Sequence, residues 1–447
     1  MKYPKYPAYK DSGVEWIGKI PEGWKIKDTK RLFKVVNGST PSTSILDYWD
    51  GDIIWITPED LSKSNKYVIN SERKITSEGY KSCGTTLVPP NSLILSTRAP
   101  IGYAALTSSE CCTNQGCRSL VPYDGTYSDY YYYFMISCKE ILNTMGNGAT
   151  FKELSKSNLE SLGLLVPSLA EQKQISFFLD STLEKIDNGL ANLQKMIELL
   201  KEKRQAIITH AVTKGLDPNV PMRDSGVEWI GEIPSSWNVV QTKWLMSCND
   251  EVIPENSPSS FELTYVEISD VDFTRGITNR ELMRFEDTPS RARRKVRDGD
   301  IIISTVRTYL KAIAEIKAPD NNLVVSTGFA VLRPRKVLQS FAKYALSASY
   351  FIEKVISESF GVSYPAITAD RLVSIKLAVP DIKTQEEIAD LLDKQTMNID
   401  SLVKKQEEMI DLLREHRFSL ISSAVTGKIE VRNLKINEIS ESNKYHG

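Results

Sequence analysis

The eight residues DSGVEWIG occur twice in this 447-residue chain, beginning at residue 11 and again at residue 224, which is 213 positions later. The match extends on both sides, since KDSGVEWIGKIPEGW from Lys10 aligns with RDSGVEWIGEIPSSW from Arg223. The same offset returns far downstream, where VPSLAEQKQI from Val166 aligns with VPDIKTQEEI from Val379. Chance does not produce identities of this length, so we infer a tandem duplication that folds as two related units.

Between these anchors the two halves differ widely, apart from patches such as ILSTR at 94–98 beside IISTVR at 302–307. Each unit therefore combines a shared opening segment, a divergent domain and a shared closing segment. We expect an opening segment and first domain at 1–167, a long helix at 168–214, a second opening segment and domain at 215–380, a second long helix at 381–428 and a polar tail at 429–447.

The two closing segments carry the pattern of long helices. Their seam positions repeat in alternating steps of four and three residues, which is the spacing of a coiled coil. In the first copy these positions are Ile175, Leu179, Thr182, Ile186, Leu190, Leu193, Ile197, Leu200, Arg204, Ile207 and Ala211. In the second copy they are Ile388, Leu392, Gln395, Ile399, Val403, Gln406, Ile410, Leu413, Arg417, Leu420 and Ala424. Both copies contain the same extra four-residue step, so the two helices share one register.

Capping signals agree with these helices. Ser168 with Glu171, and Thr384 with Glu387, have the spacing of a capping box. A glycine marks the expected end of each helix, Gly215 in the first copy and Gly427 in the second.

A helix with such a stripe needs a partner, and the other copy is the simplest one, paired as an antiparallel coiled coil. The alternative is that each helix packs on its own globular domain. The length of the stripe in both copies favours the coiled coil. Arg204, Gln406 and Arg417 occupy seam positions, where we expect them to set the register or to face another subunit.

The divergent domains have the pattern of mixed α and β structure. Short β-branched runs bounded by Gly, Pro, Asn and Asp predict strands at 52–57, 92–97, 300–305 and 329–334. Helical stretches are expected around 131–142 and 341–356. The predicted fold class is therefore α+β, with two tandem divergent domains of mixed α/β structure separated by two long helices.

Composition indicates a soluble cytoplasmic protein. The net charge is -1, no apolar run approaches 18 residues, and MKYPKYPAYKD lacks the apolar core of a signal peptide, so we expect no membrane partner. Five of the six cysteines lie in the first half, which does not suit a disulfide framework shared by a duplicated fold. Cys111, Cys112 and Cys117 have no second cluster to complete a zinc site, so we expect reduced thiols and no metal.

Catalytic motifs are absent or weak. The chain has neither a phosphate-binding Gly-Lys-Ser/Thr loop nor a Gly-x-Ser-x-Gly turn. Asp300, Glu315 and Lys317 follow the order of nuclease residues, but the aligned part of the first domain has no such string. We therefore expect no catalytic residues.

Charge alone does not identify a nucleic-acid partner. Lys and Arg number 15 against 14 Asp and Glu over residues 25–165, and 19 against 17 over residues 238–378. The exception is RARRKVR at 291–297, for which DNA contact and an ordinary solvated face are equally compatible.

Together, these segments resemble the DNA specificity subunit of type I restriction-modification enzymes. The resemblance covers almost the whole chain and is carried by the repeated SGVEWIG opening, WITPEDL at 55–61, GNGATFKEL at 146–154 beside SFGVSYPAI at 359–367, and PSLAEQKQI at 167–175. The second closing segment departs from the pattern, because Thr384 stands where the first copy has Glu171.

The resemblance implies a division of labour. Each divergent domain would be a target-recognition domain that reads one half of a bipartite, asymmetric site in double-stranded DNA. The helices would hold the two domains apart and dock two modification subunits, which restriction subunits would join. S-adenosylmethionine, ATP and magnesium would be bound by those partners, and this chain would be a non-catalytic subunit without a cofactor.

The residues expected to contact DNA lie near predicted strand ends and loops. In the first domain they are Ser39, Thr40, Arg98, Gln115, Arg118 and Lys152, and in the second Arg293, Arg294, Arg307, Lys311 and Ser363. A different function remains open, namely a coiled-coil scaffold with two protein- or glycan-binding domains. The low net charge favours that scaffold slightly, and the full-length resemblance favours DNA.

Overall fold

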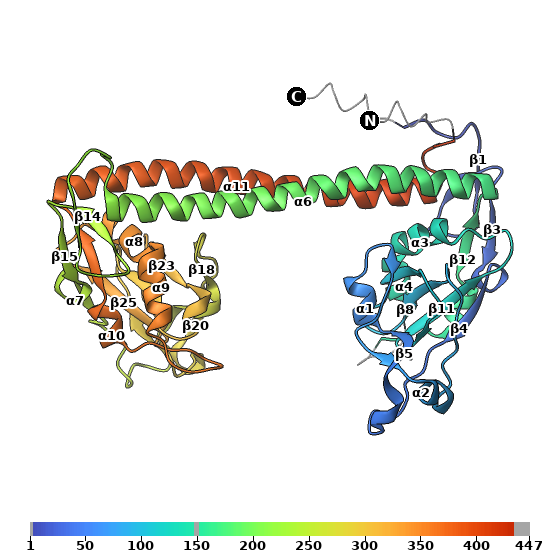
Figure 1. Ribbon diagram of the computed structural model, residues 1–447, viewed down its shortest axis with the longest axis horizontal. Helices are drawn as coiled ribbons and strands as arrows, with labels where there is room; N and C mark the ends of the chain where they lie inside the picture. Colours follow the sequence, from blue (N-terminus) through green and yellow to red (C-terminus); the bar gives the residue numbers. More distant parts are fainter. Residues whose placement is uncertain (1–2, 147–151, 433–447) are drawn as a thin grey trace. The chain divides into compact units, whose positions relative to one another are not determined.

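The computed structural model describes residues 3–146 and 152–432 of the chain (Figure 1). The chain divides into two compact units. The first comprises Met1–Asn192 and Met409–Gly447, and the second comprises Leu193–Glu408. Each unit has its own core of buried apolar side chains, so the duplication seen in the sequence corresponds to two separately packed bodies.

The first unit contains the strands and helices of the first divergent domain. Its strands are β1 (Tyr9–Asp11), β2 (Lys19–Pro21), β3 (Lys25–Asp28), β4 (Phe33–Asn37), β5 (Trp49–Ile56), β6 (Tyr67–Val68), β7 (Lys74–Ile75), β8 (Leu93–Ser96), β9 (Ala104–Thr107), β10 (Cys112–Thr113), β11 (Cys117–Pro122) and β12 (Gly163–Val166). Its helices are α1 (Pro58–Lys63), α2 (Ser77–Ser82), α3 (Ser128–Ser137), α4 (Lys139–Met145) and α5 (Lys156–Ser161), together with parts of α6 (Leu169–Lys214) and of α11 (Ile382–Val425).

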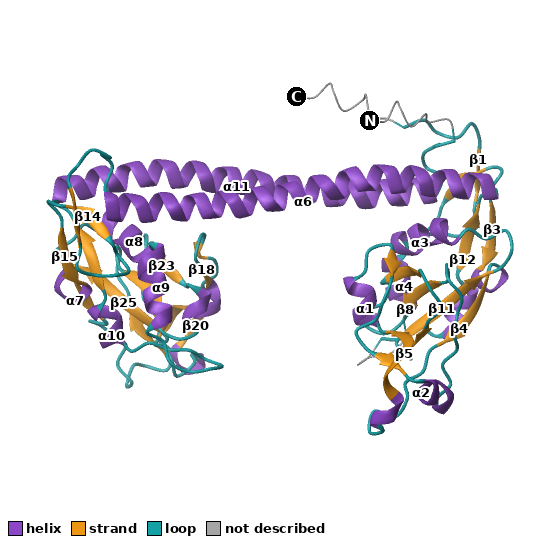
Figure 2. Ribbon diagram, viewed as in Figure 1, coloured by secondary structure: helices purple, strands orange, loops and turns teal. Residues whose placement is uncertain are grey.

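Two sheets form the body of the first domain. One has the strand order β4-β11-β8-β9-β6 and the other β10-β5-β7. Figure 2 shows the strands of this domain in orange and its helices in purple. The four residues of β8, LILS, are all buried, as expected for a strand with hydrogen-bonded neighbours on both edges. Helix α3 packs on β8 and β9 through a run of buried tyrosines, which makes this side of the sheet the core.

The second unit also consists of short strands and short helices beside parts of the two long helices. Its strands are β13 (Met222–Asp224), β14 (Glu232–Pro234), β15 (Asn238–Gln241), β16 (Met246–Cys248), β17 (Glu262–Val266), β18 (Val271–Asp272), β19 (Gly276–Ile277), β20 (Glu281–Arg284), β21 (Ala292–Lys295), β22 (Ile301–Ser304), β23 (Ile313–Glu315), β24 (Leu323–Ser326), β25 (Phe329–Pro334) and β26 (Lys376–Val379). Its helices are α7 (Thr242–Leu245), α8 (Gln339–Ser347), α9 (Ser349–Ser357) and α10 (Ala369–Ser374), with part of α6 and of α11 (Ile382–Val425).

The second domain is also built on two main sheets, with strand orders β16-β25-β22-β23 and β20-β17-β24-β21. The fully buried strand β22 corresponds to β8 of the first domain. The shared segments close both domains in the same way, because β3 pairs with β12 and β15 pairs with β26, antiparallel in each case. Within the sequence these pairs join the start of each divergent domain to its end.

The repeated opening segments form hairpins that hold the C-terminal ends of the long helices. In the first unit, β1 and β2 pack at the end of α11, where the Tyr9 hydroxyl donates a hydrogen bond to the Gly427 carbonyl at 3.1 Å. In the second unit, β13 and β14 pack at the end of α6, where Lys214 Nζ donates to the Glu232 carbonyl at 2.6 Å. Each copy of DSGVEWIG thus supports the helix that belongs to the other copy.

The long helices pair within each unit. In the first unit Arg417 Nε of α11 lies 2.8 Å from Asp187 Oδ1 of α6, and in the second unit Arg204 Nε of α6 lies 2.9 Å from Asp400 Oδ1 of α11. Adding 213 to the numbers of Asp187 and Arg204 gives Asp400 and Arg417, so the two ion pairs are duplicates. Higher numbers on one helix meet lower numbers on the other, so the paired segments run antiparallel in both units.

The structure confirms the mixed α/β fold class and the long helices. The segments expected as strands belong to β5, β8, β22 and β25, and the expected helical stretches form α3 with α4 and α8 with α9. Both proposed packing modes of the long helices occur. Residues such as Ile175 and Leu179 enter the core of a globular domain, whereas the seam residue Arg204, further along α6, pairs with Asp400 of α11.

One capping prediction is wrong. The first helix has the expected box, in which Ser168 N lies 3.2 Å from Glu171 Oε2 and Glu171 N lies 3.3 Å from Ser168 Oγ. In the second helix Asp381 is the capping residue, since its carboxylate accepts from Thr384 N at 3.1 Å and from the Thr384 hydroxyl at 2.7 Å. Thr384 therefore belongs to the first turn of α11, because the stronger acceptor Asp381 precedes it.

Candidate nucleic-acid interface

A common arrangement of three loops lies at the end of the buried central strand in each domain. In the first domain, Thr97 N donates to the Gly116 carbonyl at 2.8 Å and Leu154 N donates to the Thr97 carbonyl at 2.8 Å. In the second, Thr305 N donates to the Gly328 carbonyl at 2.7 Å and Ile367 N to the Thr305 carbonyl at 2.8 Å. We call these two arrangements the loop junctions. The same backbone connections therefore hold different side chains in the two domains.

The glycines of the loop junctions lie very close to neighbouring side chains. A Cβ atom added to Gly116 would lie 2.9 Å from Pro58 Cγ, and one added to Gly328 would lie 2.7 Å from Ile268 Cδ1. Real Cβ atoms do not approach other atoms this closely, so a larger residue at either position would require the neighbouring side chain to move.

The segments behind these glycines also correspond. Thr57 N donates to Asp60 Oδ2 at 2.8 Å in WITPEDL, and Glu267 N donates to Asp270 Oδ2 at 2.8 Å in the second domain. Only the first of these segments stands out in the sequence, because the second domain reads YVEISDV at 265–271 and matches it at few positions.

The first loop junction is surrounded by the six residues predicted for the first domain. Arg98 is exposed, and its Nε lies 2.9 Å from Glu153 Oε2. Arg118 is buried, and its guanidinium donates to the Thr97 hydroxyl at 2.9 Å. Arg98 is therefore available to a ligand, whereas Arg118 supports the junction from inside.

The remaining predicted residues of the first domain lie on the neighbouring loops. Ser39 N donates to the Thr113 carbonyl at 3.0 Å, and the Thr40 hydroxyl donates to the Gln115 side chain. Gln115 and Lys152 are exposed, on either side of the junction. The structure thus brings all six predicted residues to one end of the β4-β11-β8 sheet. Part of the GNGATFKEL motif, residues 147–151, lies outside the described residues.

Arg307 and Ser363 lie together at the second loop junction. Arg307 has a left-handed backbone with φ of 51°, and its N donates to the Pro365 carbonyl at 2.8 Å. Its guanidinium carbon lies 4.8 Å from the centre of the Tyr364 ring. Lys311 is exposed but lines a separate cleft with residues of α6 and α9, such as Lys201 and Glu353, so it is directed away from this pair.

Arg293 and Arg294 lie on β21, at a bulge in its pairing with β24. Arg293 stacks on Phe285, with 5.0 Å from its guanidinium carbon to the ring centre, and Arg294 Nη2 lies 3.5 Å from the Thr327 carbonyl. Both side chains are half-buried, and burial lowers the pKa of the Arg294 guanidinium. Thr327 precedes Gly328, so this strand adjoins the second loop junction.

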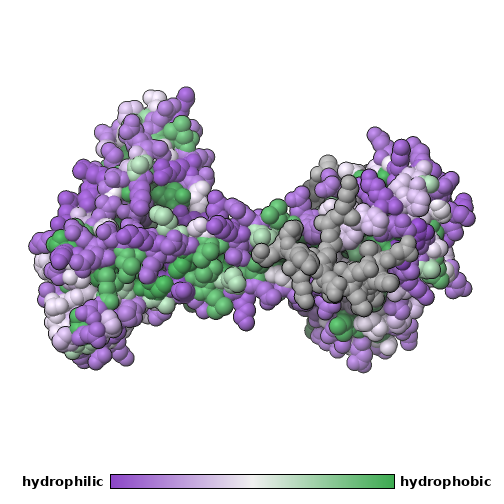
Figure 3. Space-filling view, turned by 90° about the horizontal axis from the view of Figure 1, so that it is seen from above, coloured by the Kyte–Doolittle hydropathy of each residue, from purple (hydrophilic) through white to green (hydrophobic). Residues whose placement is uncertain are grey.

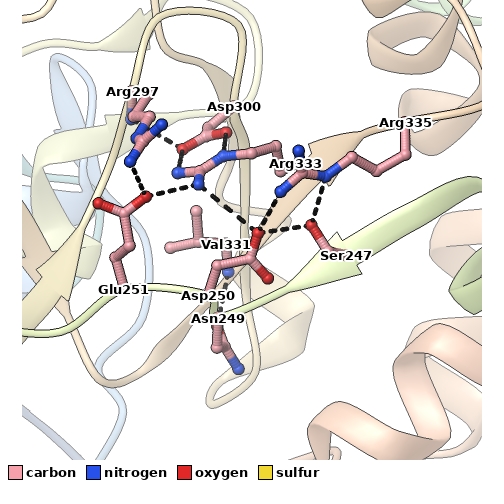
Figure 4. Close-up of polar contacts among 9 residues, drawn as sticks. All are labelled: Ser247, Asn249, Asp250, Glu251, Arg297, Asp300, Val331, Arg333 and Arg335. Atoms are coloured by element: carbon pink, nitrogen blue, oxygen red, sulfur yellow. Dashed lines mark hydrogen bonds and ion pairs between the residues drawn. The ribbon is translucent and has the colours of Figure 1, made fainter.

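Acidic residues neutralise part of the basic run at 291–297. Arg297 contacts Glu251 at 2.7 Å, and the same carboxylate accepts from Arg333 at 2.6 Å; Figure 4 draws both contacts. These hydrogen bonds hold the pKa of Glu251 below its usual range. Arg291 lies 3.7 Å from Glu267 in a further ion pair. The run is therefore a partly compensated strand rather than an open basic patch.

The nuclease-like string gives no metal site. Asp300 is buried and accepts two hydrogen bonds from Arg333, at 2.7 and 2.8 Å (Figure 4). Glu315 is held by Lys317 at 3.1 Å and by Lys343 at 3.6 Å. Over residues 3–146 and 152–432, no group of three or more His, Cys, Asp or Glu residues is arranged to hold a metal ion. None of the helices described is long and apolar enough to span a bilayer.

Two glutamines missed by the sequence analysis anchor the long helices. The Gln172 side chain accepts from Tyr127 N at 2.9 Å and donates to the Pro167 carbonyl at 3.1 Å. Gln385 does the same, accepting from Leu338 N and donating to the Pro380 carbonyl, both at 2.9 Å. The signal was present, because the two glutamines align at the repeat offset. Gln406, by contrast, is a half-buried seam residue.

Comparisons with known proteins agree with this geometry. A family model described as the type I restriction modification DNA specificity domain matches residues 21–200 and 276–411. The MjaIX specificity subunit of a type I restriction enzyme from Methanocaldococcus jannaschii is 40% identical over 189 residues, which are 42% of this chain and 43% of that relative. The MjaVIII specificity subunit from the same organism is 23% identical over 93% of this chain and 95% of its own length.

A solved structure shows the same fold along nearly the whole chain. Its description reads "structural basis underlying complex assembly and conformational transition of the type I R-M system". The match has a TM-score of 0.67 at 16% identity and covers 91% of this chain and 98% of that chain. The family model matches parts of both units and most of the sequence. The chain therefore belongs to the type I restriction modification DNA specificity domain family.

Proposed function

We propose that this chain is the sequence-specific DNA-binding subunit of a type I restriction-modification complex. Each divergent domain contacts one half of a bipartite, asymmetric duplex site. The observation that carries this proposal is the loop junction, which has the same backbone connections in both domains but different side chains around it. Arg98, Gln115 and Lys152 surround the first, and Arg307 and Ser363 adjoin the second. A fixed frame with variable side chains is what two readers of different half-sites require.

Two modification subunits dock on the long helices in this proposal. Met196 and Leu199 of α6 are exposed, and the duplication repeats them at the same offset as the exposed Met409 and Leu412 of α11. Figure 3, seen from above, shows apolar atoms along the helices. Exposed apolar side chains that recur in both repeats suit two copies of one partner.

Catalysis resides in the partner subunits. Modification and restriction subunits bind S-adenosylmethionine, ATP and magnesium, and this chain acts in the cytoplasm as a non-catalytic component without a cofactor of its own. The pairing of Asp300 with Arg333 supports this assignment, because the carboxylate already accepts two charged hydrogen bonds.

Methylation mapping tests the proposal. The chain is co-expressed with its modification subunit in a host without other adenine or cytosine methylation, and the genome is sequenced for modified bases. We expect one bipartite motif with two unlike halves. Duplex binding in electrophoretic shifts, with and without the modification subunit, separates this function from that of a protein- or glycan-binding scaffold. If a folded complex neither methylated DNA nor bound the duplex, that result would contradict the proposed function.

A further inference from the structure

The loop between α9 and α10 presents an apolar tip to solvent. Its residues Phe360, Val362 and Tyr364 are 65%, 102% and 64% exposed. The loop is a closed hairpin, because Phe360 and Ala366 exchange two backbone hydrogen bonds of 2.9 Å each. Gly361 has φ of +113°, which other residues rarely adopt, so this backbone is built for a sharp protruding turn.

The tip is fixed to the second loop junction. The hydroxyls of Thr308 and Ser359 lie 2.8 Å apart, and Arg307 N is bonded to the Pro365 carbonyl. Tyr309 and Leu310, on the adjacent turn, are also exposed. Several large apolar side chains are therefore exposed to solvent on a loop that is held in place by hydrogen bonds, which is typical of a surface that contacts a ligand.

Cations flank this tip on both sides. The Arg307 guanidinium lies 4.8 Å from the Tyr364 ring centre, and the Arg371 guanidinium lies 4.6 Å from that of Phe360. The sequence contains no acidic residue at 359–368 or at 304–311. Glu358, just before the loop, is paired with Lys354 at 2.7 Å and also lies 3.5 Å from the Arg371 guanidinium, so Arg371 shares this carboxylate with Lys354.

An apolar centre with positive charge on either side matches duplex DNA better than a protein surface. Phosphates line both edges of a groove, and the base edges between them include the thymine methyl group, which is read by apolar contact. A protein partner that presents Lys or Glu side chains would not need an apolar, uncharged tip with one guanidinium at each end.

We propose that residues 360–364 form the apolar base-contacting element of the second domain, with Val362 packed against a thymine methyl group in the major groove. Arg307 and Arg371, oriented by their aromatic neighbours, contact the phosphates on either side. This inference rests on the proposed function and adds to it one base that the second half-site contains.

The test removes the apolar group from each side of the contact in turn, the thymine methyl group from the DNA and the valine methyl groups from the protein. In the complex with the modification subunit, each thymine of the second half-site is replaced in turn by deoxyuridine, and duplex affinity is measured for the unaltered chain and for Val362→Ser. At one position we expect the unaltered complex to bind the uracil duplex about three- to ten-fold more weakly. Val362→Ser should bind the thymine and uracil duplexes equally.

A matched control is Leu282→Ser, which removes another exposed apolar side chain of the same unit, on β20. It should keep the full preference for thymine. Four results would overturn the inference while leaving the proposed function intact: a second half-site without thymine, full uracil discrimination by Val362→Ser, lost modification-subunit binding with unchanged DNA affinity, or weakened binding that is independent of the methyl group. Absence of any specific duplex binding would instead contradict the proposed function.

Discussion

Arginine side chains in the second domain occupy two different environments. Arg333 lies against the buried Asp300, which is 1% exposed, and completes a network with Glu251. Arg307 lies on a left-handed turn, with its guanidinium over an aromatic ring and no acidic partner in the adjacent loops. The first therefore stabilises the fold, and the second is available to DNA.

Replacing Arg307 with alanine should weaken binding to every sequence alike. In the arrangement inferred above its guanidinium contacts a phosphate, so affinity falls by about 1–3 kcal/mol and the slope of affinity against salt falls by about one. Competition binding with a library of sites at several salt concentrations measures both. If the variant instead relaxes a single position of the site, Arg307 reads a base.

Asp300→Asn should destabilise the second unit. The substitution removes the carboxylate charge beside the largely buried Arg333 guanidinium. Removing one partner of a buried ion pair costs about 3–5 kcal/mol of stability. We expect a loss near the lower limit, because Glu251 still pairs with Arg333. Denaturant unfolding gives the loss. Asp411→Asn is the control, since the Asp411–Arg414 pair is exposed and should contribute less than about 1 kcal/mol. Equal effects of the two variants would contradict this view of the network.

At the scale of helices and strands, the duplication is visible as repeated contacts. The Arg204–Asp400 and Arg417–Asp187 pairs join the same two helices at equivalent positions. A shift of either helix by one turn would separate both pairs, which leaves partly buried charges without partners. These pairs therefore suit a role in fixing the register of the seam.

A double-mutant cycle on Arg204 and Asp400 tests this role. Each alanine variant should lower stability, and the coupling energy should be about 1 kcal/mol or more, because Arg204 is mostly buried. Exchanging the two residues, as Arg204→Asp with Asp400→Arg, should recover part of the loss. The exposed Asp411–Arg414 pair provides the comparison, and a coupling as small as in that pair would remove the register role.

Gly427→Ala should destabilise the first unit more than Gly215→Ala destabilises the second. Both glycines have a left-handed backbone, so both substitutions incur the same backbone strain. A Cβ on Gly427 would lie 2.5 Å from Pro21, whereas one on Gly215 would lie 3.4 Å from Trp237. Thermal unfolding of the two variants measures the difference in stability. An equal loss of stability would show that the β1–β2 hairpin, which contains Pro21, moves away from the added methyl group at little cost.

The sequence predicted the elements better than the site. Periodicity identified both long helices, because a seam repeated in two copies is a strong signal. Arg98 and Arg118 carry the same charge in the sequence, yet one is exposed and the other buried, because burial depends on which loops meet at the junction. Ser363 was predicted as a contact in the loop at 359–367, but the exposure of its apolar neighbour Val362 was not, since an exposed position and a core position look alike in one sequence.

At the scale of the whole molecule, the shared segments form a frame into which the divergent domains are inserted. The pairing of β15 with β26 joins the start of the second domain to its end, and Thr242 Oγ1 donates to the Ile375 carbonyl at 2.8 Å. The first domain has the same bond, from Thr29 to the Leu162 carbonyl at 3.0 Å. The variable residues lie between these fixed contacts.

Exchanging residues 244–365 for the matching part of a relative should therefore change one half-site only. Both ends of the exchanged segment lie inside the β15–β26 pair, so the frame and the long helices remain. Methylation mapping of the hybrid gives the new motif, and the unaltered chain gives the reference. A motif that changes in both halves would show that the two domains do not act independently.

The first unit is assembled from both ends of the chain. Its core combines Trp24 and Tyr130 with Val425, whose carbonyl accepts from the Tyr130 hydroxyl at 2.8 Å. The whole of Leu193–Glu408 is translated between these parts, which takes roughly 10 to 45 s at about 5–20 residues per second. The residues before Leu193 are therefore synthesised well before the segment that completes their core, and until then their apolar surface is open to chaperones and proteases.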